Sequence, residues 1–298
     1  MKQIEVRREN KIKRNAGEQI LQAIIYLIII LLCLAILLPC LNVLVLSFND
    51  GKDAARGGIW FWPRQLTLDN FREVFKDGSI MGAYGISIAR TVIGTFLSLM
   101  VTTLAGYALK QKDLPGRTVL TMLITFTMLF DGGMIPKYIQ YKNLHLLNSF
   151  WVYVVPSLVS TFFEGIPDSL EESAKLDGCG FFKIYTKIMM PLSKPVIAVV
   201  GLYTAVNHWN DWFSGAFYMS DTSKWPVQTV LQNMLTKAMN AQQNVETVAQ
   251  ALAQNAATTT SDSLKMAAVV VTTVPILCVY PFIQKYFAQG SMIGAVKE

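Results

Sequence analysis

The sequence predicts an all-α, polytopic membrane protein with six transmembrane helices, and three observations support that fold class. Hydrophobic residues make up 52% of the chain and charged residues only 15%, whereas soluble domains carry about 25% charged residues. The apolar residues come in long runs rather than in stripes along one helix face. Mean hydropathy is accordingly positive, at +0.37. Backbone amides in lipid must bond within their own segment, so these runs are expected to be helices.

The apolar segments follow one another in the order 19–46, 83–109, 118–136, 149–163, 196–219 and 264–287. The first is long enough to cross a hydrocarbon core of about 30 Å and too long for a signal peptide, so it is expected to be a retained helix. The fourth is short and contains Pro156. A five-helix alternative would omit it and put residues 164–195 outside.

Basic residues set the orientation. Six of them precede the first apolar run, which predicts a cytoplasmic N-terminus, and an even number of helices returns the C-terminus to the same side. They are Lys2, Arg7, Arg8, Lys11, Lys13 and Arg14. The predicted parts are a tail (1–18), a transmembrane domain (19–289) with an inner loop (164–195) and outer loops (47–80 and 220–263), and a C-terminal tail (290–298).

The two outer loops differ in composition. Residues 47–80 contain Trp60, Phe61 and Trp62, where interfacial anchoring is the favoured interpretation, followed by a predicted short surface helix over 68–75. Residues 220–263 are rich in Gln, Asn, Ala and Thr, too polar for lipid and available to a partner outside.

Several function classes are excluded. The net charge of +6 comes from basic residues at the ends of apolar runs, without the basic groove of a nucleic-acid binder. The sequence has no Gly-x4-Gly-Lys-Ser/Thr phosphate loop, so the chain is not itself an ATPase. His145 and His208 are the only histidines and no Cys-x-x-Cys occurs, so neither catalytic nor metal-ligating residues are predicted.

The inner loop has helix signals. Pro167 suits a first helical turn, and Gly178 permits the left-handed conformation that ends a helix. A second short helix is expected over 181–189, closed by Pro191 and Pro195. The two together predict a helix-turn-helix lying on the cytoplasmic face.

This loop resembles the coupling loop of ABC importer permeases. That motif has Glu-Ala-Ala, then Gly, then Ile-x-Leu-Pro after nine residues, and this chain keeps every spacing with Ser173 and Met190 as departures. The resemblance implies a type I ABC importer permease fold and contact with a cytoplasmic ATPase. The matching residues are Glu172, Ser173, Ala174, Asp177, Gly178, Ile188 and Pro191.

Three further motifs, over 130–136, 209–213 and 281–287, are similar to maltose-type carbohydrate permeases, most of all to the branch for complex and acidic oligosaccharides such as alginate or aldouronates. The resemblance implies import of oligosaccharides, with acidic ones among the candidates, by alternating access at the bacterial cytoplasmic membrane. It also implies a second permease, two ATP-binding subunits that hold ATP and Mg²⁺, and an extracytoplasmic binding protein. No cofactor is expected in this chain.

Two polar sites in the apolar segments are candidates for the substrate pathway. Arg90 would suit an acidic sugar or could extend to the outer headgroups. The segment 207–212 mixes aromatic and hydrogen-bonding groups, which suit sugars but also helix pairing. Its candidates are Asn207, Trp209, Asn210, Asp211 and Trp212.

Three alternatives remain open: a permease for a non-sugar solute such as a polyamine or phosphate, an ion-coupled secondary transporter, and an intramembrane enzyme.

Overall fold

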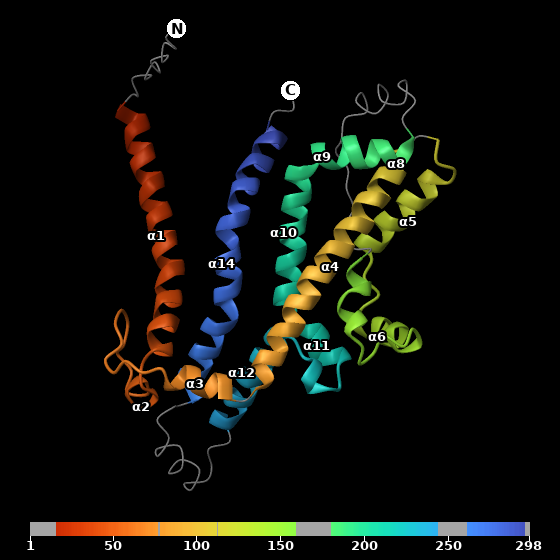
Figure 1. The fold of residues 1–298 in the computed structure, drawn as a ribbon. Coiled ribbons are helices and arrows are strands. Elements are labelled where there is room, and N and C mark those ends of the chain that lie inside the picture. The colour runs from red at the N-terminus through yellow and green to blue at the C-terminus, as the bar shows by residue number, and fades with distance from the viewer. Residues whose placement is uncertain (1–15, 77, 112, 159–179, 244–260, 296–298) are drawn as a thin grey trace, which may run out of the picture.

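A computed structural model describes residues 16–76, 78–111, 113–158, 180–243 and 261–295 (Figure 1). The secondary structure of this part is helical, and its one β-bridge pairs Asn49 with Leu66. The α-helices are α1 (Ala16–Ser47), α2 (Gly51–Ala54), α3 (Asp69–Lys76), α4 (Ser79–Lys110), α5 (Arg117–Leu129), α6 (Met134–Asn143), α8 (Phe181–Ile184), α9 (Met190–Leu192), α10 (Lys194–Asn210), α11 (Phe213–Tyr218), α12 (Val227–Gln243) and α14 (Ser261–Ala295).

Two of the described helices, α1 and α4, are long and apolar enough to cross a membrane by themselves. The segments Phe181–Leu192 and Val196–Asn210 meet the same criterion as a pair, although the chain bends by 80° between them. The prolines predicted to close the second inner-loop helix lie near this bend, with Pro191 in α9 and Pro195 in the first turn of α10. The predicted helix over 181–189 is present as α8 followed by a π-helical turn, η3 (Tyr185–Met189).

Three predicted spans are interrupted, and the one over 196–219 breaks at 211–212, between α10 and α11. Residues 118–136 form α5 and then break at 130–133 before α6 begins. At this break the Asp131 carboxylate accepts from the Gly133 amide (2.8 Å) and pairs with Lys137 (2.6 Å). A four-residue break therefore replaces the last turn of the expected helix.

The predicted span over 149–163 is not an α-helix in its described part. It forms two 3₁₀ turns, η1 (Phe150–Tyr153) and η2 (Val155–Ser157), and the remainder from residue 159 lies outside the described residues. Pro156 supplies no amide to a longer helix. Val152 and Val154 are almost fully buried, so one side of this segment is packed into the protein.

The central pair is α4 with α10, which run antiparallel (Figure 1). Glycines allow their close approach: a Cβ on Gly94 would lie 2.5 Å from the His208 ring, and one on Gly201 would lie 3.1 Å from Leu99. Small residues at such crossings let helix backbones pack tightly in lipid, where the hydrophobic effect does not drive association.

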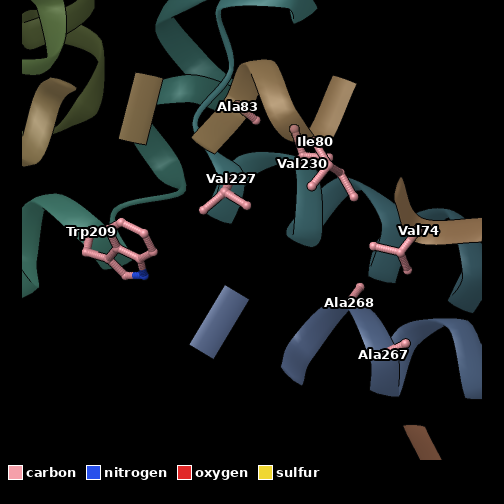
Figure 2. Close-up of a cluster of buried hydrophobic side chains, with 8 residues drawn as sticks. All are labelled: Val74, Ile80, Ala83, Trp209, Val227, Val230, Ala267 and Ala268. Carbon is pink, nitrogen blue, oxygen red and sulfur yellow. The ribbon is translucent and has the colours of Figure 1, made fainter. Parts of the chain in front are cut away.

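A cluster of buried hydrophobic side chains joins five helices near the N-terminus of α4 and the C-terminus of α10 (Figure 2). It draws on α3, α4, α10, α12 and α14. The Trp209 indole is part of it and donates to the Thr272 carbonyl (3.2 Å). Its members are Val74, Ile80, Ala83, Trp209, Val227, Val230, Ala267 and Ala268. The cluster fixes those ends of α4 and α10, between which the candidate site lies.

Candidate functional site

A cavity of about 340 Å³ lies where α10 ends and α11 begins. Its wall combines α4, the two 3₁₀ turns, α10 and α11, and most of its side chains are polar. The lining residues are Arg90, Val152, Tyr153, Pro156, Ser157, Thr204, Asn207, His208, Asp211 and Ser214. The volume is within the range of small-molecule sites, and hydroxyl and amide groups are the partners that sugars require.

Arg90 is fully buried within the chain. Its Nη2 pairs with Asp211 Oδ2 at 2.6 Å and its Nη1 donates to the Asp211 carbonyl at 2.9 Å. The guanidinium carbon lies 4.7 Å from the centre of the Tyr153 ring, within cation–π range. Asp211 Oδ1 in turn accepts from the Ser214 amide (3.0 Å). The pair thus joins α4, η1 and the α10–α11 break.

The formal charges of Arg90 and Asp211 cancel at the wall of the cavity. Asp211 accepts from both terminal nitrogens of the guanidinium, so a sugar carboxylate would meet an arginine whose charge is already paired. Arg90 Nε is buried and has no hydrogen-bond partner among the described residues. The cavity therefore presents neutral hydrogen-bonding groups more than a free positive charge.

His208 closes one side of the cavity. It is buried against Gly94, and its Nε2 lies 3.4 Å from the Ser157 hydroxyl. Thr204, one turn earlier on α10, exposes its side chain to the same space. Spacings of three and four residues on α10 therefore bring Thr204, His208 and Asp211 to one wall.

The structure brings together only part of the predicted pathway. Arg90, Asn207 and Asp211 line the cavity, whereas Trp209, Asn210 and Trp212 do not. Trp209 belongs to the buried cluster described above. The Trp212 carbonyl accepts from the Thr229 hydroxyl (2.8 Å). The Trp212 side chain is exposed.

Sequence reasoning missed the residues that the 3₁₀ turns contribute. Tyr153 and Ser157 come from a segment predicted to be a membrane span, and nothing in their spacing indicates a cavity wall. Thr204 and His208 carried a usable signal, because they share a helix face with Asn207 or Asp211.

Outside the membrane-spanning helices, a network of hydrogen bonds holds η1 in place. Tyr153 donates to the Lys224 carbonyl (2.9 Å), and Asn148 accepts from the Asp221 amide (3.1 Å). Asp221 accepts from both the amide and the hydroxyl of Ser223, and these bonds lower its pKa. The turn η4 (Thr222–Lys224) is thus bonded to η1, which supplies part of the cavity wall.

The predicted coupling residues fall into two groups. Glu172, Ser173, Ala174, Asp177 and Gly178 lie outside the described residues. Ile188 and Pro191 are described, in η3 and α9.

The described part of the inner loop contacts α4 directly. The Tyr185 hydroxyl lies 2.7 Å from that of Thr103, and its ring centre is 5.5 Å from that of Tyr107. Ile184 and Met189 are buried, with Tyr107 and Ile188 packed against them. A displacement of the inner loop would therefore bear directly on α4, the helix that carries Arg90.

Comparison with known proteins identifies the family. The family model "Binding-protein-dependent transport system inner membrane component" matches residues 13–292. The chain belongs to this family.

Within the described residues, no group of three or more His, Cys, Asp or Glu side chains could hold a metal ion.

Curated relatives cover nearly the whole chain. The polygalacturonan/rhamnogalacturonan transport system permease protein YtcP of Bacillus subtilis is 37% identical over 282 residues, 92% of this chain and 97% of that protein. Protein LplC of the same organism is 38% identical over 269 residues, covering 88% and 89%. The arabinooligosaccharides permease AraQ of Halalkalibacterium halodurans is 28% identical over 272 residues, covering 87% and 90%.

A solved structure has the same fold. The chain is similar, with a TM-score of 0.78 and 24% identity, to a chain of a bacterial ABC transporter involved in the import of the acidic polysaccharide alginate. The match covers 92% of this chain and 99% of that one. The predicted all-α permease fold is thereby confirmed, and the number of membrane crossings stays a prediction.

Proposed function

We propose that this chain is a permease subunit of an ATP-driven, binding-protein-dependent importer of oligosaccharides and works by alternating access. The observation that carries the proposal is the family match over residues 13–292, together with relatives at 37% and 28% identity named as permeases for polygalacturonan/rhamnogalacturonan and for arabinooligosaccharides. A non-sugar permease and an ion-coupled transporter have less support, since the relatives named above for a substrate are named for sugars.

Acidic oligosaccharides are the proposed substrate class. Polygalacturonan and alginate, in the names of a relative and of the structural neighbour, are both uronic-acid polymers. The sequence motifs alone had favoured the same branch.

The proposed pathway includes the cavity at the α10–α11 break. Asn207, Ser157 and Thr204 would supply hydrogen bonds to hydroxyls of a passing sugar. Arg90 and Asp211 would form a neutral wall, and Trp209, Asn210 and Trp212 would act by supporting the break rather than by lining the path.

The proposed assembly contains a second permease, two cytoplasmic ATP-binding subunits that hold ATP and Mg²⁺, and an outer binding protein. The long apolar surface of α1 is consistent with contact to lipid and to the second permease. Coupling would run through Glu172, Ser173, Ala174, Asp177 and Gly178, with both termini and the tail 290–298 on the cytoplasmic side.

The test is uptake by the reconstituted complex. Proteoliposomes holding both permeases and the ATPase, supplied with the binding protein, should accumulate labelled galacturonate oligomers only with ATP inside. Uptake of a polyamine or phosphate instead, or uptake driven by an ion gradient without ATP, would replace this proposal with one of its rivals. External labelling of cysteines placed in 172–178 would separately contradict the inner position of the loop.

A further inference from the structure

Three consecutive aromatic side chains stand exposed in the loop between α2 and α3. Trp60, Phe61 and Trp62, here called the aromatic tip, have exposed fractions of 67%, 67% and 81%. Large aromatic side chains are normally buried, because each removes 150–250 Å² of mostly apolar surface from water when it is covered. Such a tip therefore indicates a contact with an apolar or amphipathic partner.

The residues on both sides of the aromatic tip are fixed. Ile59, just before it, is buried, and its carbonyl accepts from the Asn42 side chain of α1 (2.7 Å). After it, Arg64 pairs with Asp53 (3.2 Å) and donates to the Gly57 carbonyl. The three aromatics are thus presented by a built loop.

Two backbone hydrogen bonds also hold the base of the loop in place. The Asp50 amide donates to the Gln65 carbonyl (2.9 Å), and the Thr67 amide donates to the Phe48 carbonyl (2.8 Å). These bonds close the loop immediately beyond α1, so the aromatic tip has a defined height relative to that helix.

That height follows from the Asn42 bond. Asn42 lies five residues before Ser47, the end of α1, which is about 7.5 Å along the helix axis. The loop therefore folds back beside the last turns of α1 instead of extending away from them. Those turns expose Leu41 and Leu44, and the most apolar stretch of α1 has no buried residue. The aromatic tip is thus level with the end of a lipid-compatible surface.

We propose that the aromatic tip is a membrane anchor that inserts into the headgroup region of the outer leaflet. Trp concentrates at this depth because its ring is apolar and its N–H needs a polar partner. Lys52 and Arg56, exposed in the same loop, supply positive charge suited to lipid phosphates. The continuity of the tip with the exposed end of α1 favours lipid over a protein partner as the occupant.

The anchor also has a mechanical consequence. Asn49, between α1 and α2, accepts from the Gln65 amide of the loop (2.9 Å) through its side chain and from Asn70 of α3 (2.8 Å) through its carbonyl. The helix α3 in turn contributes Val74 to the buried cluster. Holding the loop at headgroup depth would therefore fix the depth of α3 and, through it, of the outer ends of α4 and α14.

Fluorescence quenching tests the proposal on the complete complex in nanodiscs. The probes are phosphatidylcholine brominated near the headgroup, phosphatidylcholine brominated near the chain ends, and aqueous iodide. Emission lost in the Trp60→Phe/Trp62→Phe variant is the emission of the aromatic tip, and this variant keeps the aromatic character of the exposed positions. Trp151→Phe, another exposed tryptophan replaced in the same way, is the matched control for general effects of the change.

The expected result is that the shallow bromines quench the emission of the aromatic tip more strongly than the deep bromines do, and that iodide quenches it weakly. Strong quenching by iodide with none by bromine would place the tip in water and overturn the proposal. If none of the three quenchers reduced the emission of the aromatic tip, the second permease or the binding protein would cover the tip. That result would also overturn the proposal. Each result is independent of whether the complex transports sugar.

Discussion

Replacing Asp211 with alanine should destabilise the folded protein strongly, because it leaves the buried Arg90 without its counter-charge. The change removes the 2.6 Å ion pair and the acceptor of the Ser214 amide, while the backbone carbonyl of residue 211 and the Tyr153 ring stay near the guanidinium. Removing one partner of a buried pair costs about 3–5 kcal/mol.

The lower end of that range is expected here. Asp211 is 30% exposed on its side chain, so water can enter the vacated space and partly solvate Arg90, which is itself fully buried. About 3 kcal/mol corresponds to roughly a hundredfold change in the unfolding equilibrium. The double variant Arg90→Met/Asp211→Leu should cost less than Asp211→Ala alone, because it leaves no buried charge.

The assay is unfolding of the purified protein by SDS in mixed detergent micelles. Asp131→Ala is the matched control: it breaks an ion pair of the same 2.6 Å length with Lys137, but with both side chains largely exposed, so little change is expected. If Asp211→Ala unfolds at the same SDS fraction as Asp131→Ala, or if the double variant is less stable than the single one, then the burial of Arg90 against Asp211 does not set the stability in this way.

Four further outcomes are expected. Gly94→Val should cost about 1–3 kcal/mol by overpacking against His208, where even a Cβ would lie at 2.5 Å, and the SDS titration measures it. Gly215→Ala should cost a similar amount, about 1–3 kcal/mol, because its Cβ would lie 2.2 Å from a threonine hydroxyl. Gly178→Trp should abolish ATP-dependent uptake while membrane insertion, followed by fractionation, is unchanged; wild-type uptake would contradict the coupling role. Arg90→Lys should lower uptake of acidic and neutral oligosaccharides alike, since the arginine charge is already neutralised; a selective loss of acidic uptake would refute that reasoning.

The long helices could be predicted because lipid imposes a simple rule on sequence. The run 19–46 became α1 and the run 83–109 became α4, each within a few residues, since an uninterrupted apolar stretch has no other stable form in a bilayer. The short surface helix predicted over 68–75 is present as α3.

The interruptions could not be predicted from the same rule. Residues 149–158 are apolar enough to resemble a span, but Val152, Tyr153 and Val154 are buried in a cluster with Tyr218 and Met219, so protein contacts decide their 3₁₀ conformation. The Arg90–Asp211 pair joins residues 121 positions apart, and no local pattern identifies such a partner. The cavity depends on both features, which is why only three of its lining residues were predicted.

The ion pair of Arg90 with Asp211 affects which subunit of the importer can recognise an acidic sugar. A substrate carboxylate approaching Arg90 would meet a guanidinium whose charge is offset by Asp211. The attraction for an anion is therefore weak, because the two formal charges cancel at distances larger than the 2.6 Å that separates them. If the importer selects uronic acids, we therefore expect most of the selection to come from the binding protein or the second permease, with the proposed cavity of this chain serving the hydroxyls of acidic and neutral oligosaccharides alike.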